Sequence, residues 1–285
     1  MQNIFWFISI AIISLVSTAY TIYMKRDTYK VSTLLVFYFY MAGLTWICEF
    51  TVLGLFNAYS YKTGLFIDPW AQNLLGHLLL NTTFYPSAAI IVVTSSRRHA
   101  WIAFFTALFT FSDYLYVHLG VYDHHWWRYY MTFITVSVLM VIAYKWFDRM
   151  NQRRYGLTRA ITFFFVAMLI IHTPAPILLL LEKQYYKLDF INNICGNLYL
   201  SSILIIFFYH VIEAFLLILF TCVLKKWYWS IVPFFISIVA QSIFVKMNIL
   251  IMEGGWNFAW TLIIYEIFIA IFILFEKNTL KPRLN

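Results

Sequence analysis

The chain has 285 residues, of which 63% are hydrophobic and 11% are charged, against roughly 45–50% and 25% in a soluble domain. This composition excludes a water-soluble globular protein. The formal net charge of +8 lies mostly in short loops between apolar runs, which reflects membrane topology and not nucleic-acid binding. The runs have helix length and lack the ten-residue alternation of a barrel, so we predict an all-α fold, a polytopic transmembrane helix bundle.

Nine spans are predicted, each long enough to cross a hydrocarbon core about 30 Å thick. The second and seventh exceed this length, so we expect them to be tilted, kinked or partly interfacial, and an arrangement with eight spans is the alternative. The predicted spans are residues 3–23, 31–56, 71–96, 100–119, 128–147, 160–181, 196–223, 228–251 and 257–276.

The first span is apolar enough to be a signal peptide. Its basic residues follow the apolar run, however, and no small-residue cleavage site stands out. A signal peptide has the opposite order. We therefore interpret residues 1–30 as a retained transmembrane helix with a basic inner loop.

A weak internal repeat relates the remaining eight spans. Residues 97–101 (RRHAW) align with residues 225–229 (KKWYW) at an offset of 128. We predict two four-helix units, residues 31–159 and 160–285, in the same orientation, which makes a parallel repeat. Further aligned pairs are Tyr61/Tyr186, Lys62/Lys187, Asn73/Asn193, Gly76/Gly196, Asp113/Gln241, His118/Lys246, Trp127/Trp256 and Thr132/Thr261.

Basic residues predict the orientation, because cytoplasmic loops retain Lys and Arg. With the N-terminus outside and the C-terminus in the cytoplasm of a cell membrane, the inner side collects 15 of the 20 Lys and Arg residues. Anionic lipid headgroups at the inner face are the expected partners, particularly of residues 148–159. The five basic residues left for the outer side are Lys62, Arg128, Lys183, Lys187 and Lys246.

Ionisable side chains inside the spans carry the functional signal, because each costs about 3 kcal/mol on insertion scales unless it is paired or hydrated. If the repeat has pseudo-twofold symmetry, acid in one copy meets base in the other, and Lys246 is flanked by some of the carboxylates. We predict a polar pocket that opens to the outer side. The alternative is that these groups neutralise one another and fix helix register. The candidates for ligand or proton binding are Glu49, His77, Asp113, His118, His172, Lys246 and Glu266.

Two further features have structural interpretations that we favour. His210 and Glu213 share one helix face and could contribute to a metal site, but a side-chain hydrogen bond is the preferred interpretation because no second pair lies at a matching depth. The sixth span contains Pro174 and Pro176, so we expect it to be a broken helix with His172 beside the freed carbonyls. Residues 123–128, with two histidines and two tryptophans, are assigned to an interfacial belt.

No nucleotide-binding loop, zinc-protease motif or nucleophile elbow occurs in the sequence, and we expect no cofactor. An enzyme is therefore the weaker function class. The candidate catalytic pair for a lipid-modifying enzyme would be Asp113 as the acid and His118 as the base.

Each half has Gly-His or Gly-Asn early in a span, a basic pair with Trp at the inner turn, and Gly with a Trp-rich segment before the last span. In this order the halves, residues 31–147 and 160–276, resemble small four-helix membrane proteins of unknown function from spore-forming bacteria. The extra first helix departs from that pattern. The resemblance implies a bacterial cytoplasmic membrane and a role in the spore or cell envelope, and it implies no chemistry.

Two main function classes remain open. The first is binding or transport of a small solute or ion through the outer-facing pocket. The second is a non-catalytic membrane partner or sensor of the cell or spore envelope, in which the loops contact a membrane protein. We favour the first, because charges at one level of a duplicated bundle suit a central site.

Overall fold

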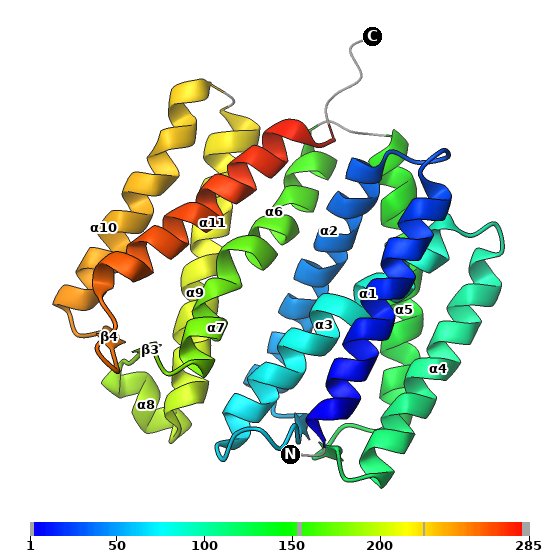
Figure 1. The fold of residues 1–285 in the computed structure, drawn as a ribbon, viewed down its shortest axis with the longest axis horizontal. Coiled ribbons are helices and arrows are strands. Elements are labelled where there is room, and N and C mark those ends of the chain that lie inside the picture. Colours follow the sequence, from blue (N-terminus) through cyan, green and yellow to red (C-terminus); the bar gives the residue numbers. More distant parts are fainter. Residues whose placement is uncertain (1–2, 153–155, 225, 281–285) are drawn as a thin grey trace. The chain divides into compact units, whose positions relative to one another are not determined.

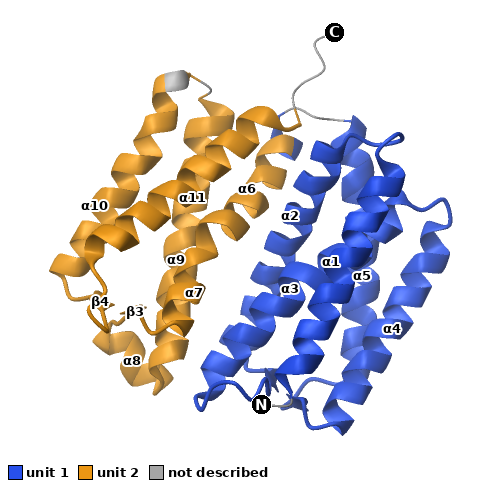
Figure 2. Ribbon diagram, viewed as in Figure 1, with its two compact units in different colours: residues 1–158, 282–285 blue, residues 159–281 orange. Residues whose placement is uncertain are grey.

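The computed structural model describes residues 3–152, 156–224 and 226–280. They form two compact units, Met1–Thr158 (unit 1) and Arg159–Lys281 (unit 2), shown in Figure 2. Within the described residues, nine helices are long and apolar enough to cross a membrane (Figure 1), which confirms the predicted number of spans. The protein is therefore consistent with a multi-pass membrane protein.

Unit 1 is built around one central helix. This helix, α3, packs against α1 and α2 and also contacts α4 and α5, which lie side by side. The first helix thus belongs to unit 1. The elements of unit 1 are α1 (Ile4–Lys25), α2 (Val31–Glu49), the π-helical turn η1 (Phe50–Leu55), β1 (Tyr59–Tyr61), α3 (Pro69–Thr94), α4 (Arg98–His118), β2 (Tyr122–His124) and α5 (Tyr129–Gln152).

Neighbouring helices satisfy the polar groups of α3. Pro86 lies inside α3 and lacks the N–H that would bond to the carbonyl of Thr82. The Tyr38 hydroxyl of α2 donates to that carbonyl at 2.6 Å. On the α1 side, the Thr18 hydroxyl donates to Ser87 Oγ at 2.7 Å. These contacts fix α1 and α2 on α3, since an unpaired carbonyl is costly in hydrocarbon.

The described residues of unit 2 contain four spans and a pair of short strands, with an additional short helix, α8, between β3 and α9. At its basic end, the Arg159 guanidinium binds the carboxylate of Glu276 and the carbonyl oxygen of Leu280. The elements are α6 (Leu157–His172), α7 (Pro174–Leu180), β3 (Gln184–Tyr186), α8 (Asp189–Cys195), α9 (Leu198–Ile218), the π-helical η2 (Leu219–Val223), the 3₁₀ turn η3 (Trp227–Ile231), α10 (Val232–Lys246), β4 (Leu250–Met252) and α11 (Phe258–Asn278).

The spans contain the irregularities that their length and prolines predicted. The second and seventh spans end in the π-helical segments η1 and η2. The sixth span is interrupted between α6 and α7, directly before Pro174. Because a π-helical turn or a proline disrupts the regular i to i−4 bonding, these segments bend without leaving their spans.

Each unit also contains a short antiparallel strand pair that the sequence did not predict. In unit 1, β1 pairs with β2 in the register Tyr61 opposite Tyr122. In unit 2, β3 pairs with β4 in the register Tyr186 opposite Leu250. The expectation of a purely helical chain is therefore correct for the spans and wrong for these connections.

The helix ends that lead into β2 and β4 have the same geometry. Gly120 and Asn248 adopt positive φ angles of 69° and 54°. The next amide in each unit bonds back five residues, Val121 N to the Tyr116 carbonyl at 2.9 Å and Ile249 N to the Phe244 carbonyl at 2.8 Å. This Schellman motif satisfies a helix-end carbonyl and turns the chain into the strand.

Gly76 of α3 positions β1, and its replacement tests this contact. A Cβ at Gly76 would lie 2.5 Å from Cγ of Tyr61, whereas a Cβ at Gly54 would lie 3.3 Å from Cδ2 of Phe50, a tight contact that a shift of a few tenths of an ångström relieves. We expect Gly76→Ala to lower the free energy of unfolding by about 1–3 kcal/mol, because the buried ring must shift. Gly54→Ala is the control and should lie within about 1 kcal/mol of wild type. Thermal unfolding in detergent measures both, and equal stabilities would contradict the close packing.

Candidate functional site

Three tyrosines gather where the β1–β2 pair meets the helices of unit 1. The rings of Tyr59, Tyr61 and Tyr122 contact one another with centroids 5.0–5.8 Å apart. The strand alternation points Tyr59 and Tyr61 to the same face, where both are buried. Burial, and after it the nearby carboxylate of Glu49, raises the pKa of the Tyr59 and Tyr61 hydroxyls well above their ordinary value. The hydroxyls are therefore neutral hydrogen-bond donors.

Glu49, the last residue of α2, is buried against this cluster. Tyr61 donates its hydroxyl to Glu49 Oε1 at 2.5 Å, and Tyr59 and Asn81 lie beside the carboxylate. All these partners are neutral. Glu49 is thus solvated by dipoles, and no counter-ion contacts it among the described residues.

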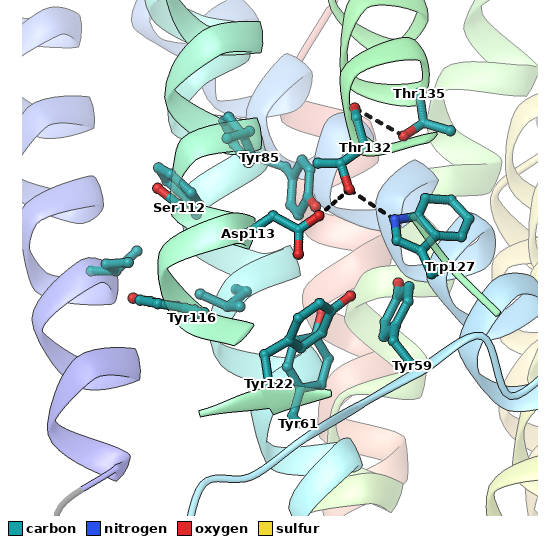
Figure 3. Close-up of a pocket in the computed structure, with 14 residues that line it drawn as sticks. Tyr59, Tyr61, Tyr85, Ser112, Asp113, Tyr116, Tyr122, Trp127, Thr132 and Thr135 are labelled. Carbon is teal, nitrogen blue, oxygen red and sulfur yellow. Dashed lines mark hydrogen bonds between the residues drawn. The ribbon is translucent and has the colours of Figure 1, made fainter. Parts of the chain in front are cut away.

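Asp113 of α4 is the second buried carboxylate of unit 1. Its Oδ2 accepts a 2.5 Å bond from the Thr132 hydroxyl, which itself accepts from Trp127 Nε1 at 2.8 Å (Figure 3). Its Oδ1 lies 2.8 Å from Nε2 of His124. Tyr85 of α3 lies near both Asp113 and Glu49. The tyrosines therefore connect the two carboxylates.

Two cavities adjoin this polar cluster. One, of about 70 Å³, lies between Asp113 and the tyrosines (Figure 3). The other, of about 490 Å³, is an apolar groove between α2 and α5 that extends from Glu49 to Ile142. Tyr59, Tyr85, Trp127 and Thr135 line both cavities. We call this combined region the tyrosine site.

The tyrosine site has a negative electrostatic character. Its lining contains the two carboxylates, and no Lys or Arg is among the residues that line the two cavities. The ring faces of Tyr and Trp add partial negative charge. The basic residue closest to the cluster in the strand pair, Lys62, binds Asp123 instead, and both side chains are half exposed.

The two histidine candidates of unit 1 lie outside the cavities. His77 is buried on α3, where its Nδ1 is 3.3 Å from the Asn81 amide nitrogen and its ring packs on Trp46. It therefore reaches Glu49 only through Asn81. His118 ends α4 and is exposed, with its ring stacked on Tyr114. Asp113 pairs with His124 and not with His118.

The candidates of unit 2 are divided between several environments. His172 Nδ1 lies 3.0 Å from His210 Nδ1, and His210 Nε2 lies 3.8 Å from Glu213. Lys246 ends α10 and forms no ion pair with Glu266 or any other described residue. Within the described residues, no group of three or more His, Cys, Asp or Glu side chains could hold a metal ion. The 3.8 Å between His210 and Glu213 is too long for a hydrogen bond, so the side-chain bond that we favour for this pair is not formed.

At the level of its strand pair, unit 2 has a neutral network. The Thr261 hydroxyl donates to Gln184 at 2.6 Å and accepts from Trp256. The Tyr186 hydroxyl donates to Gln241 at 3.2 Å. The Trp–Thr pair therefore recurs in both units, whereas the carboxylate of Asp113 is matched by an amide.

Sequence reasoning missed the roles of His124, Tyr59 and Tyr122. His124 was assigned to an interfacial belt, because a short outer loop gave no sign that it turns back toward α4. The matched pair Tyr61/Tyr186 was the available signal, since both residues stand in the three-residue strands. Without the strand register, that signal did not indicate which side chains face inward.

No family model matches the chain, and no curated protein or solved structure is similar to it.

Asp113 and Asp123 allow a matched test of the site's electrostatics. Asp113→Asn replaces an acceptor of Thr132 with an NH₂ group, so we expect a loss of about 1.5–3 kcal/mol of stability. Asp123→Asn removes only the half-exposed pair with Lys62 and should cost less than about 1 kcal/mol. Chemical unfolding in detergent measures both, and a neutral Asp113→Asn would show that the bonds of this carboxylate do not stabilise unit 1.

Proposed function

We propose that the protein binds a small amphiphilic organic cation in the tyrosine site and carries it into or across the membrane. The observation that supports this most directly is the groove of about 490 Å³ that Glu49 helps to line. A pocket of this size fits a small ligand. Its apolar walls suit the body of the ligand, and the carboxylate suits a positively charged head.

The neutral neighbours of Glu49 indicate that the ligand carries a positive charge. The hydrogen-bond donor of Glu49 is the hydroxyl of Tyr61, and the hydroxyl of Tyr59 and the amide of Asn81 lie beside it. Neutral dipoles stabilise a carboxylate but leave its net charge in place. A cation in the groove would neutralise that charge, whereas an anion would be repelled by it.

Aromatic rings strengthen the same preference. Tyr59, Tyr85 and Trp127 line both the groove and the smaller cavity. Ring faces attract organic cations, with a gain of about 0.5–2 kcal/mol per contact. The smaller cavity, of about 70 Å³, has room for about two water molecules beside Asp113.

A structural role is the alternative, and one observation favours it. Asp113 is hydrogen-bonded by Thr132 and contacts His124, and Glu49 is hydrogen-bonded by Tyr61. Well-paired polar groups also fix helix register. In that case the protein is a membrane partner or sensor, and the groove binds only lipid.

We also propose that the last eight spans are a tandem duplication of one four-helix unit. The equal strand registers, the paired Schellman motifs and the repeated Trp–Thr bond support this. The duplication agrees with the resemblance to small four-helix membrane proteins of spore-forming bacteria. We propose the matching location, a bacterial cell membrane with anionic lipid at the basic inner face.

Tetraphenylphosphonium is a suitable probe for the tyrosine site. We expect Glu49→Gln to weaken its binding to the purified protein by tenfold or more, because about 1.5–3 kcal/mol of charge interaction is lost. Glu182→Gln, at an exposed position, is the matched control and should bind like wild type. Equilibrium dialysis in detergent measures the affinities.

A second variant separates binding from folding. Val138→Trp fills the lip of the groove and should also weaken binding, while Val239→Trp, at a similarly exposed position of α10, should not. The structural alternative would be favoured if wild type does not bind the probe, or if neither Glu49→Gln nor Val138→Trp weakens its binding.

The proposed orientation places the strand pairs outside the cell. In a chain without Cys48, Cys195 and Cys222, we expect Lys62→Cys and Lys187→Cys to react with a membrane-impermeant thiol reagent in intact cells, because outer loops are accessible to it. Arg97→Cys should react only after lysis. The reverse pattern would show that the N-terminus is inside.

A further inference from the structure

A cluster of unpartnered polar atoms lies inside unit 2 on the helices α9, α10 and α11. Glu213 of α9 is 3% exposed, and Ser237 of α10 is fully buried. Together with Glu266 of α11, they come from three different spans. Each of the three residues stands near the middle of its span, where polar groups are most costly.

The atoms of this cluster are close to one another but not hydrogen-bonded. Ser237 lies beside both the Glu213 and the Glu266 carboxylates, and Tyr209 lies beside Glu213. Yet neither oxygen of either carboxylate has a hydrogen-bond partner within the described part of the chain. The same holds there for the hydroxyls of Ser237 and Tyr209. Since buried polar groups are nearly always satisfied, this spacing calls for a bridging species.

Fully buried side chains on the neighbouring turns point to the same place. His210 has an unpartnered Nε2 that lies 3.8 Å from Glu213 Oε2. Gln241 has an unpartnered amide nitrogen among the described residues and interacts with Tyr209. His210 and Gln241 are both 0% exposed. The cluster is therefore more than a pair of acids, because buried neutral groups are oriented toward it.

The two carboxylates of the cluster indicate that the bridging species is a cation. Glu213 and Glu266 repel each other. Within the described residues, neither forms an ion pair with Lys or Arg. Glu276, the other carboxylate in a span of unit 2, is instead bound by Arg159. A small cation between the two carboxylates would compensate part of the negative charge that they carry when ionised.

We propose that Glu213, Glu266, Ser237 and Tyr209 form a binding site for Na⁺ within unit 2. Carboxylate and hydroxyl oxygens are hard ligands that suit such an ion. A transition metal is disfavoured, because the cluster offers one histidine and no thiolate. Mg²⁺ is disfavoured because it retains several water molecules and a strict octahedral shell, for which this buried position is too dry. Buried ionisable residues at mid-span are also where transporters hold their coupling ions.

The first experiment compares thermal unfolding of the full-length protein in detergent with NaCl and with choline chloride at equal ionic strength. A ligand that binds only the folded state raises Tm, and at about ten times its Kd we expect Na⁺ to add about 3–6 °C. The same increase should vanish in Glu213→Gln, which removes one charged ligand. Glu253→Gln, at an exposed position, should keep the increase.

Ser237→Ala keeps the proposal testable if Glu213→Gln does not fold. This variant retains both charges and removes one neutral ligand. We expect this variant to need about tenfold more Na⁺ for the same increase in Tm. Binding of radioactive Na⁺ to the same samples provides a readout that does not depend on stability.

The outcomes separate Na⁺ from a proton as the occupant. A Tm that changes with pH but is equal in Na⁺ and choline would overturn the proposal and assign the cluster to proton binding. An increase that persists in Glu213→Gln would place the ion elsewhere and overturn it as well. Neither result bears on the tyrosine site, which belongs to unit 1.

Discussion

The structure depends on one constraint, which is that polar groups inside hydrocarbon must find partners within the protein. Tyr38 of α2 shows its local form, because its hydroxyl occupies the carbonyl that Pro86 leaves free in α3. The Schellman turns before β2 and β4 show it at helix ends. Helix packing and strand pairing in each unit thus follow from the same need to satisfy backbone groups.

The strand pairs turn this constraint into a site. A three-residue strand cannot contribute much stability, but it fixes the direction of alternate side chains. In unit 1 this directs Tyr59 and Tyr61 toward Glu49 and brings His124 back to Asp113. The carboxylates can therefore remain buried between the helices, because the chain returns to them with donors from outside the spans.

The membrane spans could be predicted from the sequence, whereas the short strand pairs between them could not. The nine spans followed from hydropathy and length, because lipid leaves few alternatives to a helix. The strand pairs did not, because three residues carry no measurable periodicity. The pairing of Asp113 with His118 failed for a geometric reason. Residues five apart on an α-helix are about 140° from each other around its axis, so His118 faces away from the partners of Asp113.

The sequence shows which carboxylates lie in the spans, but it does not show which side chains surround them. Glu49 and Glu266 look alike in the sequence, as single acids in apolar spans. Glu49 accepts a hydrogen bond from the neutral hydroxyl of Tyr61, whereas both oxygens of Glu266 lack a partner within the described residues. This difference depends on which neighbouring helix presents a hydroxyl at the same height, and that is a property of tertiary packing.

The carboxylates in the spans of unit 2 differ in how well they are paired, and this difference separates a structural role from a binding role. Arg159 covers Glu276 at the end of unit 2, an arrangement that stabilises the fold and leaves the carboxylate no capacity for a ligand. Glu213 has Ser237, Tyr209 and His210 beside it, at distances that leave its oxygens unbonded within the described residues. A purely structural role would be better served by an apolar side chain there, since burying an acid without partners costs several kcal/mol. The presence of an acid at mid-span, close to a second acid, is therefore most simply explained by a ligand that both acids bind.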